Sequence, residues 1–240
     1  MAELGFFGKI PSKGDFVRHN VNHDAARQFE RWVQTSVDAL RNAQMTVPEQ
    51  RVHFFYAAPN SNEVVLGTME PSRDQVGRRY PLTIFGIFPA EQLGSMFSSV
   101  PFAFSSYFEA LDGVFASLET ASVDSLAAAI LSVRLPGQME FQQAEQLCAN
   151  ALANPAVHDF HERVFGGLAM GRHFYAYQTF LTACSDALSK QPDETGILLD
   201  CPLRVDLDLF VWLEIVRRVF AWPPVRPSFF WVEEAEPRLL

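Results

Sequence analysis

Cysteine is scarce in this chain of 240 residues, and Cys148, Cys184 and Cys201 are widely spaced. No C-x-x-C pair occurs, so the spacing excludes a zinc ribbon and a dithiol redox motif. The simplest interpretation is that the three are buried free thiols in a protein of a reducing compartment.

Positive charge is also in short supply. The chain holds 19 Lys and Arg against 28 Asp and Glu, a net charge of −9, whereas nucleic-acid binding requires an excess of cations to neutralise phosphates. The first 90 residues contain ten basic and nine acidic side chains, and the remainder contains nine and nineteen. The first third is therefore neutral with local basic clusters. We expect no nucleic-acid partner, with RNA binding through a basic patch as a minor alternative.

No segment has the length and hydrophobicity of a membrane span. The longest uncharged run, residues 92–108, contains five Ser and a Pro and is shorter than the roughly 20 apolar residues of a spanning helix. The opening "MAELGFFGK" lacks the basic and apolar regions of a signal peptide. We therefore expect a cytoplasmic protein without membrane insertion.

Phenylalanine, by contrast, is abundant, with 22 residues, and each aromatic ring can bury about 150–250 Å² in a core. After the opening stretch, which reads as a loop, Asn22 is a plausible N-cap for a helix. Apolar residues then recur at helical spacing: Ala25, Phe29, Trp32, Val33, Val37 and Leu40. The runs Val52–Ala58 and Glu63–Met69 predict a β-hairpin, and Tyr80–Phe88 predicts a strand buried on both faces.

The rest of the chain is mostly helical in character. Residues 97–190 read as a block of helices, followed by a short buried strand in "TGILLDCP". Next comes an apolar segment from Asp206, read as a buried helix with strand as the alternative. The segment "PSFFWVEE" predicts a last strand, for which an edge position is one option. The predicted class is α+β, a mixed and largely antiparallel sheet flanked by helices with a helical block inserted in mid-chain.

We predict one domain over residues 1–240, because no linker separates independent halves. Residues 1–90 would form a loop-helix-strand part that carries the motifs described next. Residues 91–190 would form the helical block, and residues 191–240 a strand-helix-strand unit that completes the core. The sequence specifies no oligomeric state.

The stretch "GKIPSKGD" near the start invites comparison with a phosphate-binding loop. That motif requires a glycine five residues before the Gly-Lys pair and a hydroxyl residue after it, but these positions hold Glu3 and Ile10. No G-x-G-x-x-G occurs either. The structural interpretation is that Pro11 shapes one turn and Gly14 supplies a positive φ in another, while phenylalanines anchor the loop.

A second stretch, "GTMEPSRDQVGRRYPL" at residues 67–82, places more charges on a loop between two strands. The two stretches together carry Lys9, Lys13, Asp15, Arg73, Asp74, Arg78 and Arg79. Loops carry function more often than strands, although Arg–Asp pairs can simply hold two loops together. We expect the two loops to lie together in the fold.

No other motif in the sequence predicts a metal site or a catalytic site. In "HDFHE", His158, His161 and Glu162 match neither order of the helical zinc-protease motifs, and His173 is too distant to complete a set. No G-x-S-x-G sequence is present. We expect no catalytic residue, metal or cofactor.

The two stretches together resemble the TagF (ImpM) family, accessory proteins of bacterial type VI secretion systems. The family pattern is matched near the start and again around residues 71–82, and one tryptophan of its helix motif is present. Phe29 replaces the other tryptophan, and His19 follows Arg18 where a further Arg is common. The resemblance marks these residues as motif and candidate interaction positions: Gly8, Lys9, Pro11, Gly14, Asp15, Phe16, Arg18, Trp32, Pro71, Ser72, Asp74, Gly77, Arg78 and Pro81.

The resemblance implies a non-enzymatic, post-translational repressor of type VI secretion. It further implies protein–protein binding to Fha, the forkhead-associated scaffold protein of that machine. The alternative is an enzyme or small-anion-binding module that uses the cluster of Lys9, Lys13, Asp15, Asp74, Arg78 and Arg79.

Overall fold

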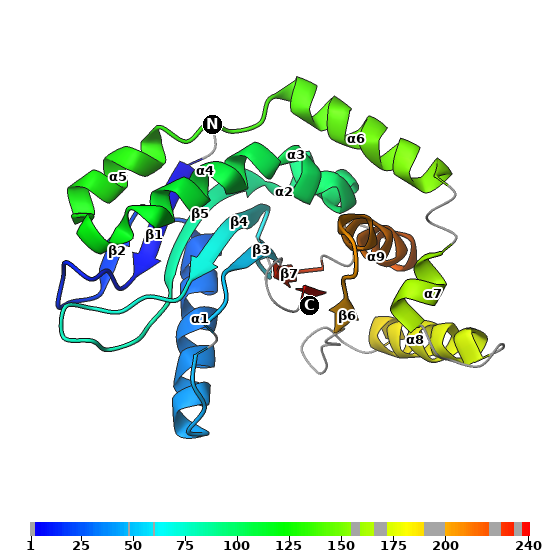
Figure 1. The fold of residues 1–240 in the computed structure, drawn as a ribbon, viewed down its shortest axis with the longest axis horizontal. Helices are drawn as coiled ribbons and strands as arrows, with labels where there is room; N and C mark the ends of the chain where they lie inside the picture. Colours follow the sequence, from blue (N-terminus) through cyan, green and yellow to red (C-terminus); the bar gives the residue numbers. More distant parts are fainter. Residues whose placement is uncertain are drawn as a thin grey trace.

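One antiparallel sheet with helices on both faces forms this protein in a computed structural model, which describes residues 3–47, 49–59, 61–154, 159–165, 172–189, 200–220, 227–232 and 237–240 (Figure 1). The strands are β1 (Glu3–Gly8), β2 (Val17–His19), β3 (Val52–Ala57), β4 (Glu63–Glu70), β5 (Leu82–Pro89), β6 (Cys201–Pro202), β7 (Phe229–Val232) and β8 (Arg238–Leu239). Their order in the sheet is β2-β1-β5-β4-β3-β7-β8-β6, and all neighbouring pairs that the structure describes are antiparallel.

The helices lie mainly between β5 and β6. They are α1 (Asp24–Asn42), α2 (Ala90–Leu93), α3 (Val100–Ala103), α4 (Ser105–Ala116), α5 (Val123–Leu131), α6 (Gln138–Ala153), α7 (Phe160–Phe165), α8 (Arg172–Ser189) and α9 (Asp206–Val219), with 3-10 turns at Gly94–Ser99 and Leu118–Thr120. The predicted α+β class with a mid-chain helical block is therefore confirmed. None of the helices in the described ranges combines the length and hydrophobicity of a membrane span.

Helix α1 covers one face of the sheet (Figure 1). Its predicted apolar stripe is confirmed, since Phe29, Val33 and Val37 are buried against aromatic residues of β3 and β5. Trp32 remains 42% exposed and stacks on Phe29 with ring centroids 5.8 Å apart. The predicted N-cap is wrong by one residue, because His23 and not Asn22 occupies that position.

The helical block covers the opposite face. Side chains of β3 alternate between the two cores, so Phe54 packs toward α1 and Phe55 toward the helical block. From α4, the Tyr107 hydroxyl donates to the Leu66 carbonyl oxygen at 3.1 Å. The predicted hairpin of β3 and β4 is confirmed, as is the burial of β5 on both faces.

The opening stretch is a β-hairpin, in which the predicted loop is limited to residues 9–16. Strand β1 pairs with β2, with Phe7 opposite Arg18, and with β5 on its other side. Phe6 and Phe7 are both fully buried, on opposite faces of the sheet. The glycines that made this segment look irregular allow close approach of backbones, so the strand lacks the usual strand composition.

The C-terminal predictions are confirmed with one correction. Helix α9 forms, and its residues 208–214 are buried around the whole circumference. Strand β7 forms but lies between β3 and β8, so the edge option is wrong. Of the predicted strand "TGILLDCP", residues 201–202 form β6, whereas residues 195–199 lie outside the described residues. All three cysteines are buried and free.

Candidate functional site

The loops after β1 and after β4, residues 9–16 and 71–81, lie side by side as predicted, and we call them the signature loops (Figure 1). Lys9 Nζ lies 2.7 Å from Asp74 Oδ2. Ser72 Oγ donates to the Lys9 carbonyl oxygen at 2.7 Å, and the Gln75 N–H donates to the Lys13 carbonyl oxygen at 2.9 Å. These contacts join residues more than 60 positions apart in the sequence, so the two signature loops form one structural unit.

Asp74 is the centre of this unit, with a side chain that is completely removed from solvent. Its Oδ1 accepts the N–H groups of Val76 at 3.1 Å and Arg78 at 2.8 Å. Its Oδ2 accepts from Lys9 Nζ at 2.7 Å and Arg78 Nε at 2.6 Å. Burial alone would raise the pKa of this carboxyl, but the hydrogen bonds from Lys9 and Arg78 hold its pKa far below the usual range. Asp74 is therefore ionised near neutral pH, and it acts as a clamp between the two loops.

Gly8 allows the loops to approach each other closely. Its φ is +136°, and a Cβ atom there would lie 2.2 Å from the Pro81 carbonyl oxygen. Gly77 also has a positive φ, of +84°, in the turn where its N–H donates to the Asp74 carbonyl oxygen at 2.9 Å. The prediction of a positive φ at Gly14 is wrong, since Gly8 and Gly77 are the glycines with that conformation in the described residues.

Phe16, the last residue of the first signature loop, holds that end of the loop against neighbouring side chains. The rings of Phe16 and Tyr80 meet edge to face at 5.1 Å between centroids. The Arg18 guanidinium lies 4.6 Å above the Phe16 ring, and its Nε lies 2.5 Å from Glu30 Oε1 on α1. Pro11 and Pro71 are partly buried within the loops.

The remaining predicted residues are not gathered into a cleft. Lys13 and Asp15 are exposed, and Arg73 reaches away to Glu119, 3.1 Å distant, on the helical block. Trp32 lies on α1 against Phe230 of β7, with centroids 5.1 Å apart. The structure thus brings together the side chains of Lys9, Asp74 and Arg78, whereas the exposed side chains of Lys13 and Asp15 are not among the donors and acceptors of that clamp.

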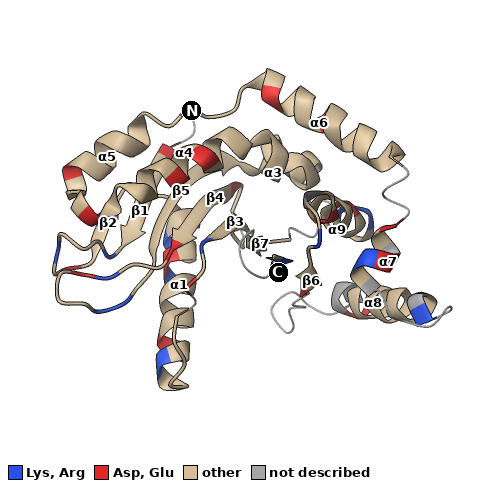
Figure 2. Cartoon of the chain, in the orientation of Figure 1, with Lys and Arg blue, Asp and Glu red and all other residues tan. Residues whose placement is uncertain are grey.

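A basic pocket of about 500 Å³ opens beside the clamp. Figure 2 shows that both signature loops carry Lys or Arg, and these loops and α1 supply the basic residues of the pocket. The lining residues are Lys9, Arg41, Met45, Thr46, Val47, Arg78 and Arg79. Sequence reasoning missed Arg41 and residues 45–47. They lie in the last turn of α1 and just after it, and they match no motif.

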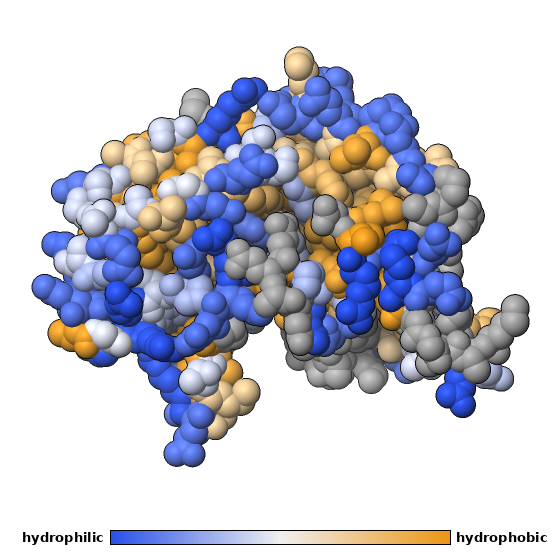
Figure 3. All heavy atoms as spheres, viewed as in Figure 1, coloured by the Kyte–Doolittle hydropathy of each residue, from blue (hydrophilic) through white to orange (hydrophobic). Residues whose placement is uncertain are grey.

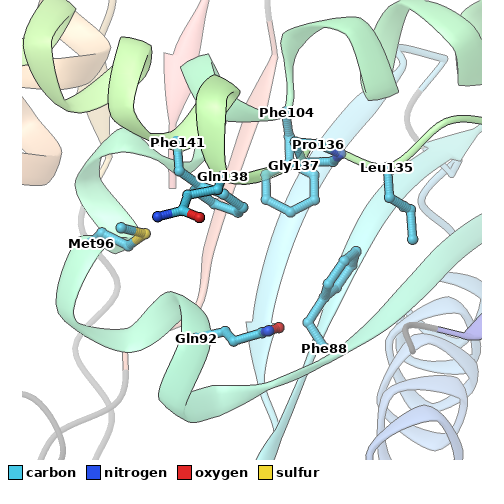
Figure 4. A pocket seen from close by; sticks show the side chains of 9 residues that line it. All are labelled: Phe88, Gln92, Met96, Phe104, Leu135, Pro136, Gly137, Gln138 and Phe141. Carbon is cyan, nitrogen blue, oxygen red and sulfur yellow. The ribbon is translucent and has the colours of Figure 1, made fainter.

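A second pocket, of about 470 Å³, is mostly apolar and lies between β5 and the helical block (Figure 4). Phe88, Gln92 and Met96 face the segment that leads into α6, and the lining contains no charged residue. Phe104 and Phe141 meet there edge to face, with centroids 5.6 Å apart. Hydrophobic side chains are also visible beneath α6 in Figure 3, whereas hydrophilic ones predominate around the signature loops. None of the predicted site residues lines this apolar pocket.

Within the part of the chain that the structure describes, no group of three or more His, Cys, Asp or Glu side chains is placed to hold a metal ion. His158 lies outside the described residues, as do the side chains of His161 and His173.

A family model and a solved structure match parts of this chain. Residues 5–133 match the model of the TagF N-terminal domain, which is type VI secretion system-associated. No curated protein sequence matches the chain. The crystal structure of PA0076 from Pseudomonas aeruginosa PAO1 is 28% identical over 56% of this chain, with a TM-score of 0.44. The match covers 64% of that protein, less than two thirds of its length. Because the domain match spans more than half of the sequence, this chain belongs to the TagF family of type VI secretion-associated proteins.

Proposed function

We propose that this protein is a non-enzymatic, post-translational repressor of type VI secretion that acts by binding the Fha scaffold. The observation that carries the proposal is that the charged side chains of Lys9, Asp74 and Arg78 bond to one another and hold the two signature loops together. Asp74 already accepts four hydrogen bonds from Lys9, Val76 and Arg78. A carboxylate held in this way has no capacity left for proton transfer near neutral pH, but it makes the loops a rigid platform.

Rigid loops suit recognition by another protein. An interface that is ordered before binding loses less conformational entropy on association. The exposed residues Lys13, Asp15, Val76 and Arg79 project around the clamp, so the platform displays both signs of charge beside an apolar side chain. In the proposed mechanism this protein occupies Fha stoichiometrically, and Fha then fails to promote assembly at the membrane complex.

The direct test is a pull-down with the Fha scaffold from the same organism, in phosphorylated and unphosphorylated forms. We expect complex formation at micromolar concentration in at least one form. Absence of binding in both forms would refute the proposal.

A charge reversal then locates the interface. Asp15→Lys should weaken Fha binding about tenfold without a change in melting temperature, since this carboxylate is exposed. Glu145→Lys, on an exposed position of α6 outside the matched domain, is the control. Equal weakening by both variants would indicate an effect of net charge and not of the signature loops.

The second candidate is a small-anion-binding module or enzyme at the same cluster, and the basic pocket is the observation that favours it. Lys9, Arg78 and Arg79 line that pocket, but Lys13, Asp15 and Asp74 do not. Only half of the six predicted residues therefore share a common hollow, and we rank this candidate below the regulator.

A further inference from the structure

The basic pocket collects four cations from three parts of the fold. Lys9 comes from the loop after β1, Arg41 from the last turn of α1, and Arg78 and Arg79 from the loop after β4. Arg41 is fixed across the pocket, because its Nη2 donates to the Arg79 carbonyl oxygen at 3.0 Å. No carboxylate is among the lining residues that the structure describes.

The cations outnumber the carboxylates that pair with them. Lys9 and Arg78 share the single carboxylate oxygen Oδ2 of Asp74. Arg41 pairs with Asp38 at 3.4 Å, and Arg79 pairs with Glu49. The Asp38 and Glu49 side chains are 52% and 71% exposed, so water screens these two pairs. One positive charge thus remains uncompensated beside an open pocket.

The end of α1 is closed by hydrogen bonds to its terminal carbonyl groups. The Gln44 N–H donates to the Arg41 carbonyl oxygen at 3.0 Å, and the Met45 N–H donates to the Leu40 carbonyl oxygen at 2.8 Å. This is the Schellman arrangement, with Gln44 at φ +56° in the left-handed position. The turn directs residues 45–47 along the pocket, where Met45 is 62% exposed.

We propose that the basic pocket binds a carboxylate side chain on a partly apolar segment of a partner protein. Guanidinium groups of Arg41, Arg78 and Arg79 supply planar donors that match a carboxylate, and the single excess charge matches one carboxylate. Met45 and Val47 form the apolar wall for a neighbouring side chain of that segment. The inference rests on the proposed function, since the segment would belong to the regulated partner.

Arg41→Gln is the test variant, and Arg27→Gln is a closely matched control. Both arginines lie on α1, each pairs with an aspartate three residues earlier, and each donates to a backbone carbonyl oxygen. Arg27 lies at the other end of the helix and outside the pocket. The two substitutions remove the same charge, so a difference between them reports on position alone.

The first probe is an acetylated peptide of alternating glutamate and leucine, titrated into the isotope-labelled full chain and followed by NMR. We expect shifts of the amide signals of residues 41, 45–47, 78 and 79, with about tenfold weaker binding to Arg41→Gln and unchanged binding to Arg27→Gln. A peptide with glutamine in place of glutamate should leave these signals unshifted. Shifts confined to other residues, no shifts, or equal losses in both variants would overturn the proposal.

The second probe is the Fha scaffold itself. If Fha binds the unmodified chain and Arg41→Gln equally well, the pocket proposal is overturned while the regulator proposal stands. If Fha binds neither and the glutamate peptide still maps to the pocket, the regulator proposal fails and the carboxylate site stands.

Discussion

Two aspartates in different parts of the fold, Asp74 in a signature loop and Asp208 in α9, have side chains that are completely removed from solvent. Asp208 lies in the first turn of α9 and accepts from Arg163 Nη2 on α7 at 2.7 Å and from the Arg204 N–H at 2.9 Å. Asp74 joins two loops 65 residues apart in sequence. Both sites satisfy a buried carboxylate with a cation and backbone N–H groups, as burial of charge requires.

The difference lies in what surrounds each clamp. Around Asp74 the loops expose Lys13, Asp15 and Arg79, and the basic pocket opens next to it. Asp208 instead begins the run 208–214 of α9, in which every residue is buried. The same kind of buried interaction thus holds together two loops with exposed charges at Asp74 and two helices, α7 and α9, at Asp208.

The largest expected effect is the loss of either carboxylate. Asp74→Ala and Asp208→Ala each leave a buried cation and backbone N–H groups unsatisfied. Each variant should lower the melting temperature by about 5–10 °C, measured by circular dichroism, whereas the exposed Asp15→Ala should melt like the unmodified chain. A normal melting temperature for one of the buried variants would break the equivalence of the two clamps.

A smaller effect is expected when a cation is removed and the aspartate is kept. The two sites should then differ, because Asp74 keeps a second cation and Asp208 loses the donors of its arginine. After Lys9→Met, Asp74 keeps Arg78, whereas Arg163→Met removes both side-chain donors that bond to Asp208 Oδ1. We expect a decrease in melting temperature of about 1–3 °C for Lys9→Met and about 3–6 °C for Arg163→Met. The reverse ranking would contradict this account of how each charge is satisfied.

Acid sensitivity tests the Asp74 clamp alone. The pKa of this carboxyl is lowered in the folded protein, so its contribution to stability is complete above about pH 4, the ordinary pKa range of aspartate, and is lost as the pH falls further. Urea unfolding at pH 2–5 should show a weaker loss of stability on acidification in Asp74→Asn than in the unmodified chain. Identical pH dependence would show that Asp74 has no depressed pKa.

The smallest effect concerns a partly exposed charged contact at the first residues of β1 and β4. His23 lies 2.7 Å from Glu63 and 2.9 Å from Glu3, and hydrogen bonds to Glu63 and Glu3 raise its pKa. The resulting stabilisation is complete below about pH 6.5 and is lost as the pH rises through the raised pKa. Because all three side chains are about one third exposed, His23→Gln should cost only about 1 °C at pH 6. The difference from the unmodified chain should vanish at pH 9, and a constant difference would contradict the titration.

Much of the fold was predictable from the sequence. The stripe containing Phe29, Val33 and Val37 predicted α1, and the alternation and turn residues predicted the β3–β4 hairpin. Strands β1 and β2 were not predictable in this way. Their glycines mask the strand pattern, and only pairing with β5 reveals why Gly5 and Gly8 are needed.

The sequence by itself determined the family and the proximity of the two signature loops, because the motif residues are local and their spacing is preserved. Tertiary structure alone decided which charges are buried. Asp15 and Asp74 look equivalent in the sequence, yet one is exposed and the other accepts four hydrogen bonds. Arg41 became part of the site only in the folded protein, because the end of α1 lies next to the second signature loop, where Arg41 donates to the Arg79 carbonyl oxygen. Burial and charge pairing depend on contacts between distant segments, and no local pattern encodes them.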